Sequence, residues 1–563
     1  MKKGEIVSGV IENVAFPNKG IMRVEDTPVT VKGTITGQKV TALVNKKRGG
    51  KAEARLLSVD EKSPLESGEQ FCPHFGICGG CCYQTMTYEG QLNFKTEQVK
   101  SLLKNYIRED GVDGAGKVCE AEFEPPHASP LELGYRGKME FSFGNEVKDG
   151  PLVLGLHKKG SFYDIVPVRE CGIIDESLRE ILKATEEWAV STGLAFYHKM
   201  QKTGYFRHLL LRRGGNTGEV LVDLVTRSAY AEFEGDLDKE AKLMEEFKEA
   251  LLGTKAAAAI KGILHTVNDA QADAIIDQGT TLLYGQDFFE DELLGLKFKI
   301  TPFSFFQTNP LGAEVLYSTV RDYVGTTKDK VIFDLYSGTG TIGQLLAPVA
   351  KKVVGIEIVE EAVESAKINA ARNGLTNCEF IAGDVLKKID EITDKPDFIV
   401  LDPPREGIVP KALSKILAYG VENMVYVSCK PTSLAHDLEA ITAAGYAVKK
   451  VTCVDMFPWT ANVETVCLLS RQRVDGHIDI DLDVEKLESK GGRATYAEIK
   501  DYVKEKYGYS ISSLYIAQIK DKVGLDKRLN YNHGTGKTDG RTLVCPPEKE
   551  EAIMDAFRYF NLI

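Results

Sequence analysis

The pattern of hydrophobic and polar positions changes twice along the chain. Over residues 1–60, short alternating runs are separated by Gly and Pro, which predicts the strands of a small barrel or sandwich. Between about 120 and 300, strand-like and helix-like segments alternate and Gly interrupts them often. From about 303 to 472, runs of Val, Ile and Leu alternate with helical segments, which predicts a parallel sheet covered by helices on both faces.

These changes divide the chain into expected domains. The chain has 563 residues, enough for three to five domains. The fold class is therefore expected to be α/β, with a Rossmann-like domain and smaller units around it. The expected parts are an N-terminal β-barrel over 1–62, a central α+β domain over 63–302, the Rossmann-like domain over 303–472, a polar linker over 473–490, and a small α+β accessory module of unknown role over 491–563.

Composition and charge narrow the class of protein. Hydrophobic residues make up 43% and charged residues 27%, values typical of a soluble globular protein. The sequence has neither a membrane-length apolar run nor a secretory leader, so a cytoplasmic protein is expected. The net charge of −12 argues against nucleic acid as partner, but residues 1–62 alone carry twelve Lys and Arg against seven Asp and Glu. A basic hairpin there is either a solvated loop or an RNA phosphate contact; it holds Lys46, Lys47, Arg48, Lys51 and Arg55.

A Gly-x-Gly turn follows the first strand of the Rossmann-like domain, in the segment DLYSGTG that starts at Asp334. Gly338 and Gly340 let the backbone approach a ligand closely, and a helix opens at Thr341. Glu357 ends the next strand, where its carboxylate can bond ribose hydroxyls, and Asp384 ends the third. Because a third Gly at dinucleotide spacing is missing, the pattern favours S-adenosylmethionine over NAD as the cofactor.

Two later strand ends carry further candidates. Asp402 begins the segment DPPR, and its last residue, Arg405, stands where enzymes that methylate exocyclic nitrogens usually have an aromatic residue. Cys429 follows the strand NMVYVS and precedes Lys430, which is either a group that lowers the pKa of the thiol or a solvated side chain. A buried Cys in a strand is often only a small core residue. At this edge, however, a thiolate could add to C6 of uracil and make C5 nucleophilic.

The last strand begins at Glu464, a candidate base for the C5 proton that must leave after methylation. A separate group of cysteines lies near the N-terminus: Cys72, Cys78, Cys81 and Cys82. Such spacing is typical of metal ligation in a reducing compartment, where three of these cysteines would bind with Cys171 or Cys119 as the fourth ligand. Thiolate ligands suit either an iron–sulfur cluster or zinc, and the residues alone leave both open.

Taken together, these motifs resemble the bacterial RNA uracil-5-methyltransferase family. The resemblance rests on their order along the chain: the cysteine group, FQTN at 306–309, DLYSGTG, LDPPR, SCKP and VET at 463–465. The branch it resembles has a TRAM domain and a [4Fe–4S] cluster and methylates 23S ribosomal RNA. The resemblance covers residues 1–472 and leaves the tail aside. It implies 5-methyluridine formation in ribosomal RNA, with transfer RNA as an alternative substrate.

The resemblance also implies roles for single residues. Cys429 matches the nucleophile and Glu464 the general base. Residues 1–60 match the TRAM RNA-binding barrel. The implied cofactor contacts are Gln307, Tyr336, Glu357, Asp384 and Asp402, beside the turn residues Gly338, Gly340 and Thr341. The implied cluster ligands are Cys72, Cys78, Cys81 and Cys171, which leaves Cys82 as a bystander.

Two rival functions stay open at this point. One is a methyltransferase acting on adenine or cytosine, which Arg405 disfavours. The other is a non-catalytic iron–sulfur protein that binds RNA or senses redox state. The expected partner is RNA, with neither DNA nor a membrane as partner, and the expected oligomeric state is a monomer.

Overall fold

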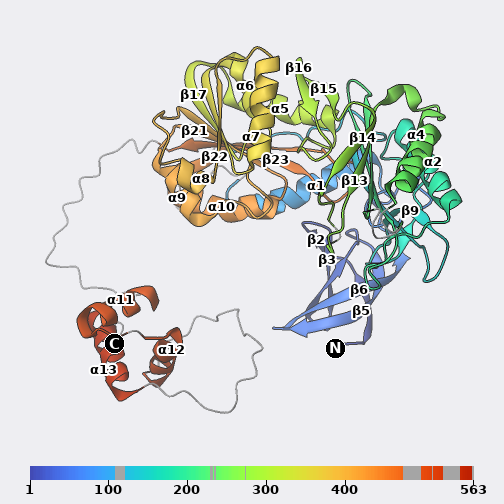
Figure 1. Ribbon diagram of the computed structural model, residues 1–563. Helices are drawn as coiled ribbons and strands as arrows, with labels where there is room; N and C mark the ends of the chain where they lie inside the picture. Colours follow the sequence, from blue (N-terminus) through green and yellow to red (C-terminus); the bar gives the residue numbers. More distant parts are fainter. Residues whose placement is uncertain are drawn as a thin grey trace. The chain divides into compact units, whose positions relative to one another are not determined.

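The computed structural model describes residues 1–107, 121–228, 233, 236–272, 274–472, 496–509, 511–523 and 546–560 (Figure 1). The chain forms two compact units, Met1–Arg473 and Val474–Ile563. The expected linker over 473–490 and the alternative ligand Cys119 lie outside the described residues.

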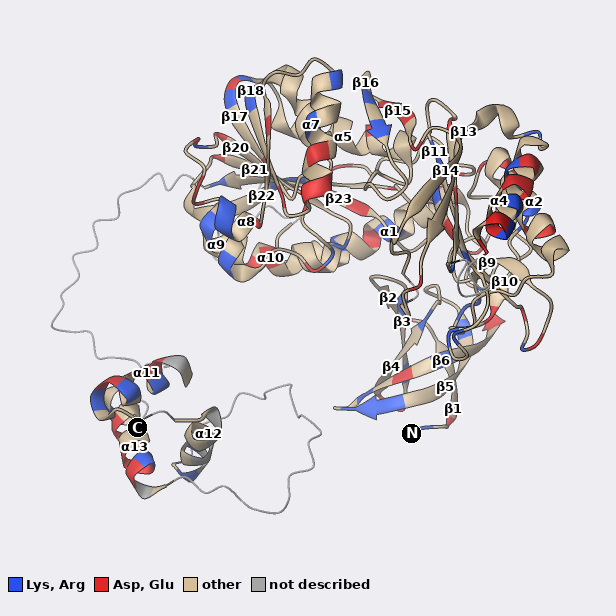
Figure 2. Ribbon diagram, viewed as in Figure 1, with Lys and Arg blue, Asp and Glu red and all other residues tan. Residues whose placement is uncertain are grey.

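The first unit starts with a six-stranded sheet. Its strands are β1 (Ile6–Val10), β2 (Asn13–Ala15), β3 (Lys19–Val24), β4 (Thr27–Lys32), β5 (Lys39–Arg48) and β6 (Lys51–Glu61). They pair in the order β1-β5-β6-β4-β3-β2, antiparallel except for β4 with β6. Alternate residues, among them Val29, Val40 and Val44, form a small apolar core. Figure 2 shows that the basic end of β5 projects at the tip of this sheet.

The central part contains a seven-stranded sheet. Its strands are β8 (Lys138–Gly144), β9 (Val153–His157), β10 (Ile165–Val166), β11 (Phe206–Arg213), β12 (Val220–Thr226), β13 (Ile260–Val267) and β14 (Thr280–Gly285). They pair in the order β10-β9-β8-β11-β12-β13-β14, antiparallel except for β12 with β13.

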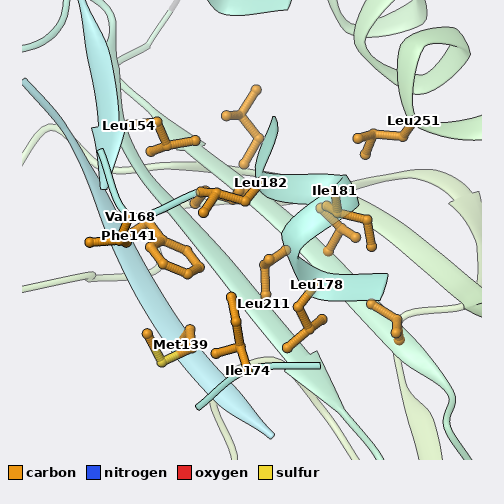
Figure 3. Close-up of a cluster of buried hydrophobic side chains, with 14 of the residues drawn as sticks. Met139, Phe141, Leu154, Val168, Ile174, Leu178, Ile181, Leu182, Leu211 and Leu251 are labelled. Carbon is orange, nitrogen blue, oxygen red and sulfur yellow. The ribbon is translucent and has the colours of Figure 1, made fainter. Parts of the chain in front are cut away.

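Two helices and a one-turn 3₁₀ helix accompany this sheet: α2 (Glu176–Thr192), α4 (Leu237–Leu252) and η1 (Ala257–Ala259). Figure 3 shows the core beneath α2, where Leu178, Ile181 and Leu182 meet Phe141 and Leu211 of the sheet. Asp175 caps the start of α2 by accepting a hydrogen bond from the Ser177 amide, which satisfies one of the free donors at the helix start.

The largest sheet has eight strands. They are β7 (Glu122–Phe123), β17 (Thr327–Leu335), β18 (Ala350–Glu357), β19 (Cys378–Ala382), β20 (Phe398–Leu401), β21 (Asn423–Ser428), β22 (Tyr446–Val454) and β23 (Glu464–Arg471). Their order is β19-β18-β17-β20-β21-β23-β22-β7. The first five run parallel, as the sequence predicted, and β23 lies antiparallel between β21 and β22.

Helices cover both faces of this sheet (Figure 1). They are α1 (Tyr88–Leu103), α5 (Pro310–Val324), α6 (Thr341–Leu346), α7 (Glu360–Arg372), α8 (Val385–Lys388), α9 (Pro410–Ala418) and α10 (Pro431–Ala443), with the 3₁₀ turn η2 (Ala347–Val349) after α6. Successive strand residues point to opposite faces, so Phe333 packs with α1, α9 and α10, whereas Ile332 packs with α5 and α6. A hairpin of β15 (Phe289–Leu293) and β16 (Leu296–Ile300) adjoins the α5 side.

The parallel strands of this sheet all come from the span predicted as Rossmann-like. Two further elements come from earlier in the chain: β7 pairs with β22, and Val99 and Leu103 of α1 enter the core of one face. Local patterns could not show this, because both contacts join segments more than 200 residues apart.

The second unit contains the helices α11 (Tyr496–Tyr507), α12 (Ser513–Lys522) and α13 (Pro547–Tyr559) around its own core, which includes Val503, Ile519 and Phe557. Strands were also expected here, but the described residues of this unit hold helices only. Among the residues described for the whole chain, none of the helices combines the length and apolar character needed to cross a membrane.

Candidate functional site

The Gly-x-Gly turn begins where β17 ends. Tyr336 has a φ of 67°, in the left-handed region, and its amide donates to the Ile356 carbonyl at 3.0 Å. The Gly338 amide donates to Glu357 Oε2 at 3.0 Å. The carboxylate that ends β18 is therefore bonded to the turn after β17. We call the region formed by the carboxyl ends of β17, β18, β20 and β21 the carboxyl edge.

Gly340 has no room for a side chain. Its φ is 69°, and a Cβ atom there would lie 2.5 Å from Cε1 of Phe380. One turn into α6, the Gly343 amide donates to Asp334 Oδ2 at 2.8 Å, while Asp334 Oδ1 is buried without a hydrogen-bond partner. Burial, and secondarily Glu357, raises the pKa of Asp334 to about 7. An unpartnered buried oxygen beside a glycine turn is what a site for a polar ligand requires.

The other expected cofactor residues gather around this turn. Asp384 caps α8 by accepting from the Leu386 amide at 2.9 Å. Burial raises the pKa of Tyr336 to about 12, and the nearby carboxylate of Asp384 adds to the shift. Gln307 lies apart from the turn, where its side chain hydrogen-bonds Tyr317 on α5. The hydroxyl of Thr341 is buried, 3.3 Å from that of Thr339.

Cys429 stands at the end of β21. This strand runs antiparallel to β23, and Ser428 is paired with Thr465, so Cys429 follows on one strand where Glu464 precedes on the other. The thiol is half-buried. Burial raises its pKa to about 11, the negative charges of Glu464 and Asp402 add to the shift, and Arg405 opposes it. The thiol therefore lies within electrostatic reach of both carboxyls and the guanidinium.

The two carboxyls near this thiol are also shifted. Glu464 is 4% exposed, and burial raises its pKa to about 8, with Asp402 adding and Arg405 opposing. Burial raises the pKa of Asp402 to about 7, with a further contribution from Asp334. Carboxyls with pKa values near neutrality can accept and release protons at working pH, which is the usual reason for such an environment in an active site.

Sequence reasoning missed two residues at the carboxyl edge. Arg405 had been read only as evidence against amine methylation, yet it is the cation that lowers the pKa of Cys429. Lys430, which was considered for that part, is exposed. Phe305 is 62% exposed beside the turn, 3.8 Å from where a Cβ of Gly338 would lie. In the sequence, the only signal for this exposed ring is the pair of Phe residues, Phe305 and Phe306, before Gln307.

The cysteine loop, residues 72–82, lies apart from the carboxyl edge. Cys171 is part of the core of the central sheet, and Cys78 and Cys81 pack against that core. Burial raises the pKa of Cys81 to about 12, and the charges of Cys171, Cys72 and Cys78 each add to the shift. The four predicted ligands are therefore near one another. Even so, among the described residues no three His, Cys, Asp or Glu side chains lie close enough to hold a single metal ion.

Trp459 connects the cysteine loop to the segment that leads into β23. Its carbonyl accepts hydrogen bonds from the amides of Cys82 at 2.7 Å and Tyr83 at 3.2 Å. Its indole N–H donates to the Glu132 carbonyl at 2.7 Å, and Phe71 packs edge-on against the ring. Trp459 has a φ of 67°, an unusual value for a bulky residue, which the surrounding bonds hold in place.

A buried ion pair holds the start of the same segment. Lys95 of α1 donates to Asp455 Oδ1 at 2.9 Å, and both side chains are at most 1% exposed. Lys95 also donates to the Phe457 carbonyl at 3.0 Å. Asn309 adds a hydrogen bond to the Met456 carbonyl, also at 3.0 Å. The segment before Glu464 is thus fixed from the helix, from the cysteine loop and from the start of α5.

The structure therefore separates the predicted residues into two groups. The carboxyl edge brings together Cys429, Glu464, Asp402, Tyr336, Gly338, Gly340, Thr341, Glu357 and Asp384, with Gln307 bound to Tyr317 nearby. The cysteine loop and Cys171 form the second group.

Comparison with known proteins finds a matching family model and similar proteins. Residues 276–472 match the family model described as tRNA (uracil-5-)-methyltransferase. An uncharacterized RNA methyltransferase of Caldanaerobacter subterraneus is 47% identical over 84% of this chain and 100% of its own length. An uncharacterized RNA methyltransferase of Clostridium tetani is 46% identical over 84% of this chain and 99% of its own length.

A solved structure shares the fold. The tRNA (uracil-54, C5)-methyltransferase of Pyrococcus abyssi, solved in complex with S-adenosyl-L-homocysteine, aligns with a TM-score of 0.61 at 24% identity. The alignment covers 82% of this chain and 100% of that one. At this identity the likeness supports the Rossmann-like methyltransferase fold.

Proposed function

This chain belongs to the RNA uracil-5-methyltransferase family and is an RNA methyltransferase that uses S-adenosylmethionine, and from that membership we propose that it methylates C5 of uridine through a covalent bond to Cys429. The observation that carries the proposal is the position of the Cys429 thiol. It lies at the carboxyl edge, across an antiparallel strand pair from Glu464 and within electrostatic reach of Asp402 and Arg405.

The proposed reaction has three steps on the RNA base. The target uridine leaves its stack, at a cost of a few kcal/mol. The Cys429 sulfur adds to C6, so that C5 gains electron density and takes a methyl group. Glu464 then removes the C5 proton, the C5–C6 double bond re-forms and the thiolate leaves. S-adenosylmethionine supplies the electrophilic methyl group.

The electrostatics of the carboxyl edge fit Cys429 as the nucleophile and Glu464 as the base. In the protein alone, burial and two carboxyls hold the thiol in its neutral form, so Arg405 is the residue that favours the thiolate. A carboxyl with a pKa near 8 is a stronger base than an ordinary Glu, and its burial keeps it from exchanging protons freely with water. The catalytic residues of the proposal are therefore Cys429 and Glu464, with Asp402 and Arg405 beside them.

The turn after β17 fits the proposed cofactor. Its glycines let the backbone approach a ligand. Two buried oxygens there, Asp334 Oδ1 and the hydroxyl of Ser337, have no hydrogen-bond partner. We propose that the contacts expected from the sequence hold S-adenosylmethionine: Tyr336, Gly338, Gly340, Thr341, Glu357, Asp384, Asp402 and Gln307. Phe305 is an additional candidate, because its exposed ring adjoins Gly338.

We further propose that the six-stranded sheet is a TRAM-type RNA-binding barrel. The hairpin at the end of β5 and the start of β6 carries Lys46, Lys47, Arg48 and Lys51, all exposed (Figure 2). Clustered cations on one hairpin suit contacts with RNA phosphates, and they offset the acidic balance of the rest of the chain locally.

The four cysteines are proposed to hold a [4Fe–4S] cluster, with Cys72, Cys78, Cys81 and Cys171 as ligands and Cys82 outside the set. Their thiols influence one another electrostatically, although they are not arranged to hold a single ion. A cluster of four irons needs thiols that surround a larger volume than one ion does. Its proposed part is structural, because none of the three steps transfers an electron.

Iron and sulfide analysis of the anaerobically purified protein tests this assignment. The account predicts four of each per chain, loss of both in Cys81→Ser, and retention in Cys82→Ser, the matched control on the same loop. A protein without iron, or a Cys81→Ser variant that keeps its iron, would remove the cluster from the account.

We propose 23S ribosomal RNA as the substrate, because it is the substrate of the branch that the sequence resembles. Ribosomal and transfer RNA from cells that lack the gene are offered separately with labelled S-adenosylmethionine, and the labelled nucleoside is identified. We expect 5-methyluridine in ribosomal RNA with the wild type, none with Cys429→Ala, and unchanged activity with Cys378→Ala, another half-buried cysteine. Label on transfer RNA alone would overturn the substrate assignment, and label on adenine or cytosine would overturn the reaction.

A further inference from the structure

The central sheet carries a cavity that none of the residues discussed above lines. The space enclosed within its walls is small, about 60 Å³, and its mouth is open to solvent. Its walls come from the end of β8, from the loop between β9 and β10, from residues 196–199, and from Arg207 and His208 of β11. We call it the ring pocket. Because the hollow is small and open, the side chains around its mouth, more than its volume, determine what it can hold.

Exposed aromatic rings stand at the mouth of the ring pocket. Phe162 is 63% and Tyr163 58% exposed, and their rings meet edge-on with centroids 5.6 Å apart. The ring of His157 is nearly parallel to that of Phe162 at 6.3 Å. Lys199 Nζ lies 4.4 Å from the centre of the Phe162 ring. Large apolar side chains that remain exposed beside cations mark a surface that a partner covers.

The inner wall is rigid and polar. Arg207 is only 3% exposed, and its guanidinium donates to the carbonyls of Asn268 and Ala270 at 2.6 Å and of Ala272 at 2.7 Å. The same guanidinium lies 4.6 Å from the centre of the Tyr197 ring. These bonds fix the ring of Tyr197 against a cation, so that one wall of the pocket is formed before any ligand binds.

The loop that carries Phe162 is fastened to its surroundings. The Gly79 amide donates to the His157 carbonyl at 3.2 Å, and the Lys159 amide to the Ile77 carbonyl at 2.7 Å. The cysteine loop therefore supports this edge of the ring pocket. The ammonium of Lys159 extends toward Gly33 of the six-stranded sheet, 3.1 Å from where a Cβ of that glycine would lie. The mouth of the pocket thus adjoins the sheet for which RNA binding is proposed.

We propose that the ring pocket holds one unstacked nucleotide of the RNA substrate, distinct from the uridine that is methylated. Aromatic rings that stack on a base, combined with cations for its phosphate, are how proteins hold single-stranded RNA. Lys199 supplies a cation over the Phe162 ring, and Lys158 and Lys159 lie in the same loop as Phe162. This inference rests on the proposed function, because it takes RNA to be the substrate. It adds a second point of contact far along the chain from Cys429.

The main test is RNA affinity in the Phe162→Ala/Tyr163→Ala double variant, measured by fluorescence anisotropy with an RNA fragment that the wild type methylates. Because stacking on one ring contributes roughly 1–3 kcal/mol per base, the dissociation constant should rise about 5- to 150-fold. The maximal rate at saturating RNA and the KM for S-adenosylmethionine should not change. Phe162→Trp, which keeps a ring at the position, should bind RNA nearly as well as the wild type.

Tyr284→Ala is the matched control. This tyrosine is 40% exposed on β14, at the opposite edge of the same sheet, and does not line the ring pocket. Its variant should bind RNA like the wild type. Thermal unfolding of all the variants shows whether they are folded. A folded double variant with unchanged RNA affinity would overturn the proposal, and so would one whose maximal rate falls while its affinity is unchanged.

Two further experiments distinguish RNA binding at the ring pocket from binding of free nucleotides and from the covalent mechanism. Binding of the four free nucleoside monophosphates is measured by calorimetry; binding as tight as that of the RNA would overturn the assignment to an RNA segment. The affinity test is repeated in a Cys429→Ala background, where methylation is absent. A loss of affinity there supports the ring pocket even if the covalent mechanism fails, so the two proposals can fail independently.

Discussion

The carboxyl edge and the ring pocket treat their functional side chains in opposite ways. At the carboxyl edge, acidic groups and a thiol are buried near one another, and burial is the main cause of every pKa shift there. At the ring pocket, aromatic rings are left exposed, and the nearby charges are cations. The first arrangement costs stability and tunes proton affinity, whereas the second leaves apolar surface ready to be covered.

The contrast separates residues that act on the reaction rate from residues that act on RNA affinity. A buried group with a shifted pKa acts on a reaction step, so its loss should lower the rate even when RNA is saturating. An exposed ring acts on affinity, so its loss should be overcome by more RNA. The predictions below either break this separation or make it sharper.

The largest effect is expected for Glu464→Gln. Without the base, the C5 proton cannot leave, so turnover should fall by roughly 10²- to 10⁴-fold, while the covalent adduct between enzyme and ordinary uridine RNA accumulates. RNA affinity measured without S-adenosylmethionine should not change. Steady-state methyl transfer and denaturing gels measure the two quantities. Glu406→Gln, an exposed neighbour of Arg405, serves as control; a Glu464→Gln variant that turns over normally would exclude Glu464 as the base.

Next in size is the effect of Lys95→Met on stability. The change leaves the Asp455 carboxylate buried without its cation, and loss of one partner of a buried pair typically costs about 3–5 kcal/mol. Chemical denaturation measures the free energy of unfolding. Lys100→Met, on the same helix but in a more exposed pair with Glu97, should cost less than about 1 kcal/mol. Equal losses in the two variants would show that the pair does not hold the segment before Glu464.

A smaller and graded effect is expected from pH. With a pKa near 8, Glu464 is mostly neutral at pH 6, so release of tritium from C5 should rise about tenfold per pH unit from 6 toward 8. Glu464→Gln should lose this part of the profile. The same raised pKa means that the neutral carboxyl suits the folded state, so its contribution to stability is lost between about pH 4.5 and 8. A flat tritium-release profile in the wild type would contradict the shift.

The smallest effect is expected for Arg405→Met. Removal of the Arg405 cation, which lowers the pKa of Cys429, should slow adduct formation by roughly three- to tenfold at neutral pH, with recovery as the pH rises. Rapid-quench measurement of the adduct gives the rate. Lys430→Met should behave like the wild type, because Lys430 is not among the groups that shift the pKa of Cys429. If Lys430→Met slowed adduct formation and Arg405→Met did not, Lys430 would be the residue that favours the thiolate.

The sequence predicted the parallel part of the fold and not the rest, for a physical reason. The strands from β17 to β21 and the turn at Gly338 follow from local patterns, because each βα unit packs against its neighbour along the chain. The addition of β7 to β22 depends on two segments that are more than 300 residues apart. No local period records such a pairing.

The same limit applies to the functional regions. Cys429 and Glu464 could be proposed because each sits at a strand end that the pattern of the domain predicts. The ring pocket could not, because Phe162, Tyr197 and Arg207 come from separate segments that only the fold brings together. The exposure of Phe162 is likewise visible only in three dimensions, since a lone Phe in a sequence usually indicates a core position.

The account depends most on a covalent bond between Cys429 and the uracil ring. RNA in which the target uridine is replaced by 5-fluorouridine cannot lose its C5 substituent as a proton, so the bond should persist after methylation. Mass spectrometry of the digested complex should then find one methylated fluorouridine attached to the peptide that contains Cys429, and no adduct with Cys429→Ala. An adduct on another cysteine, or methylated RNA without any trapped protein, would contradict the account.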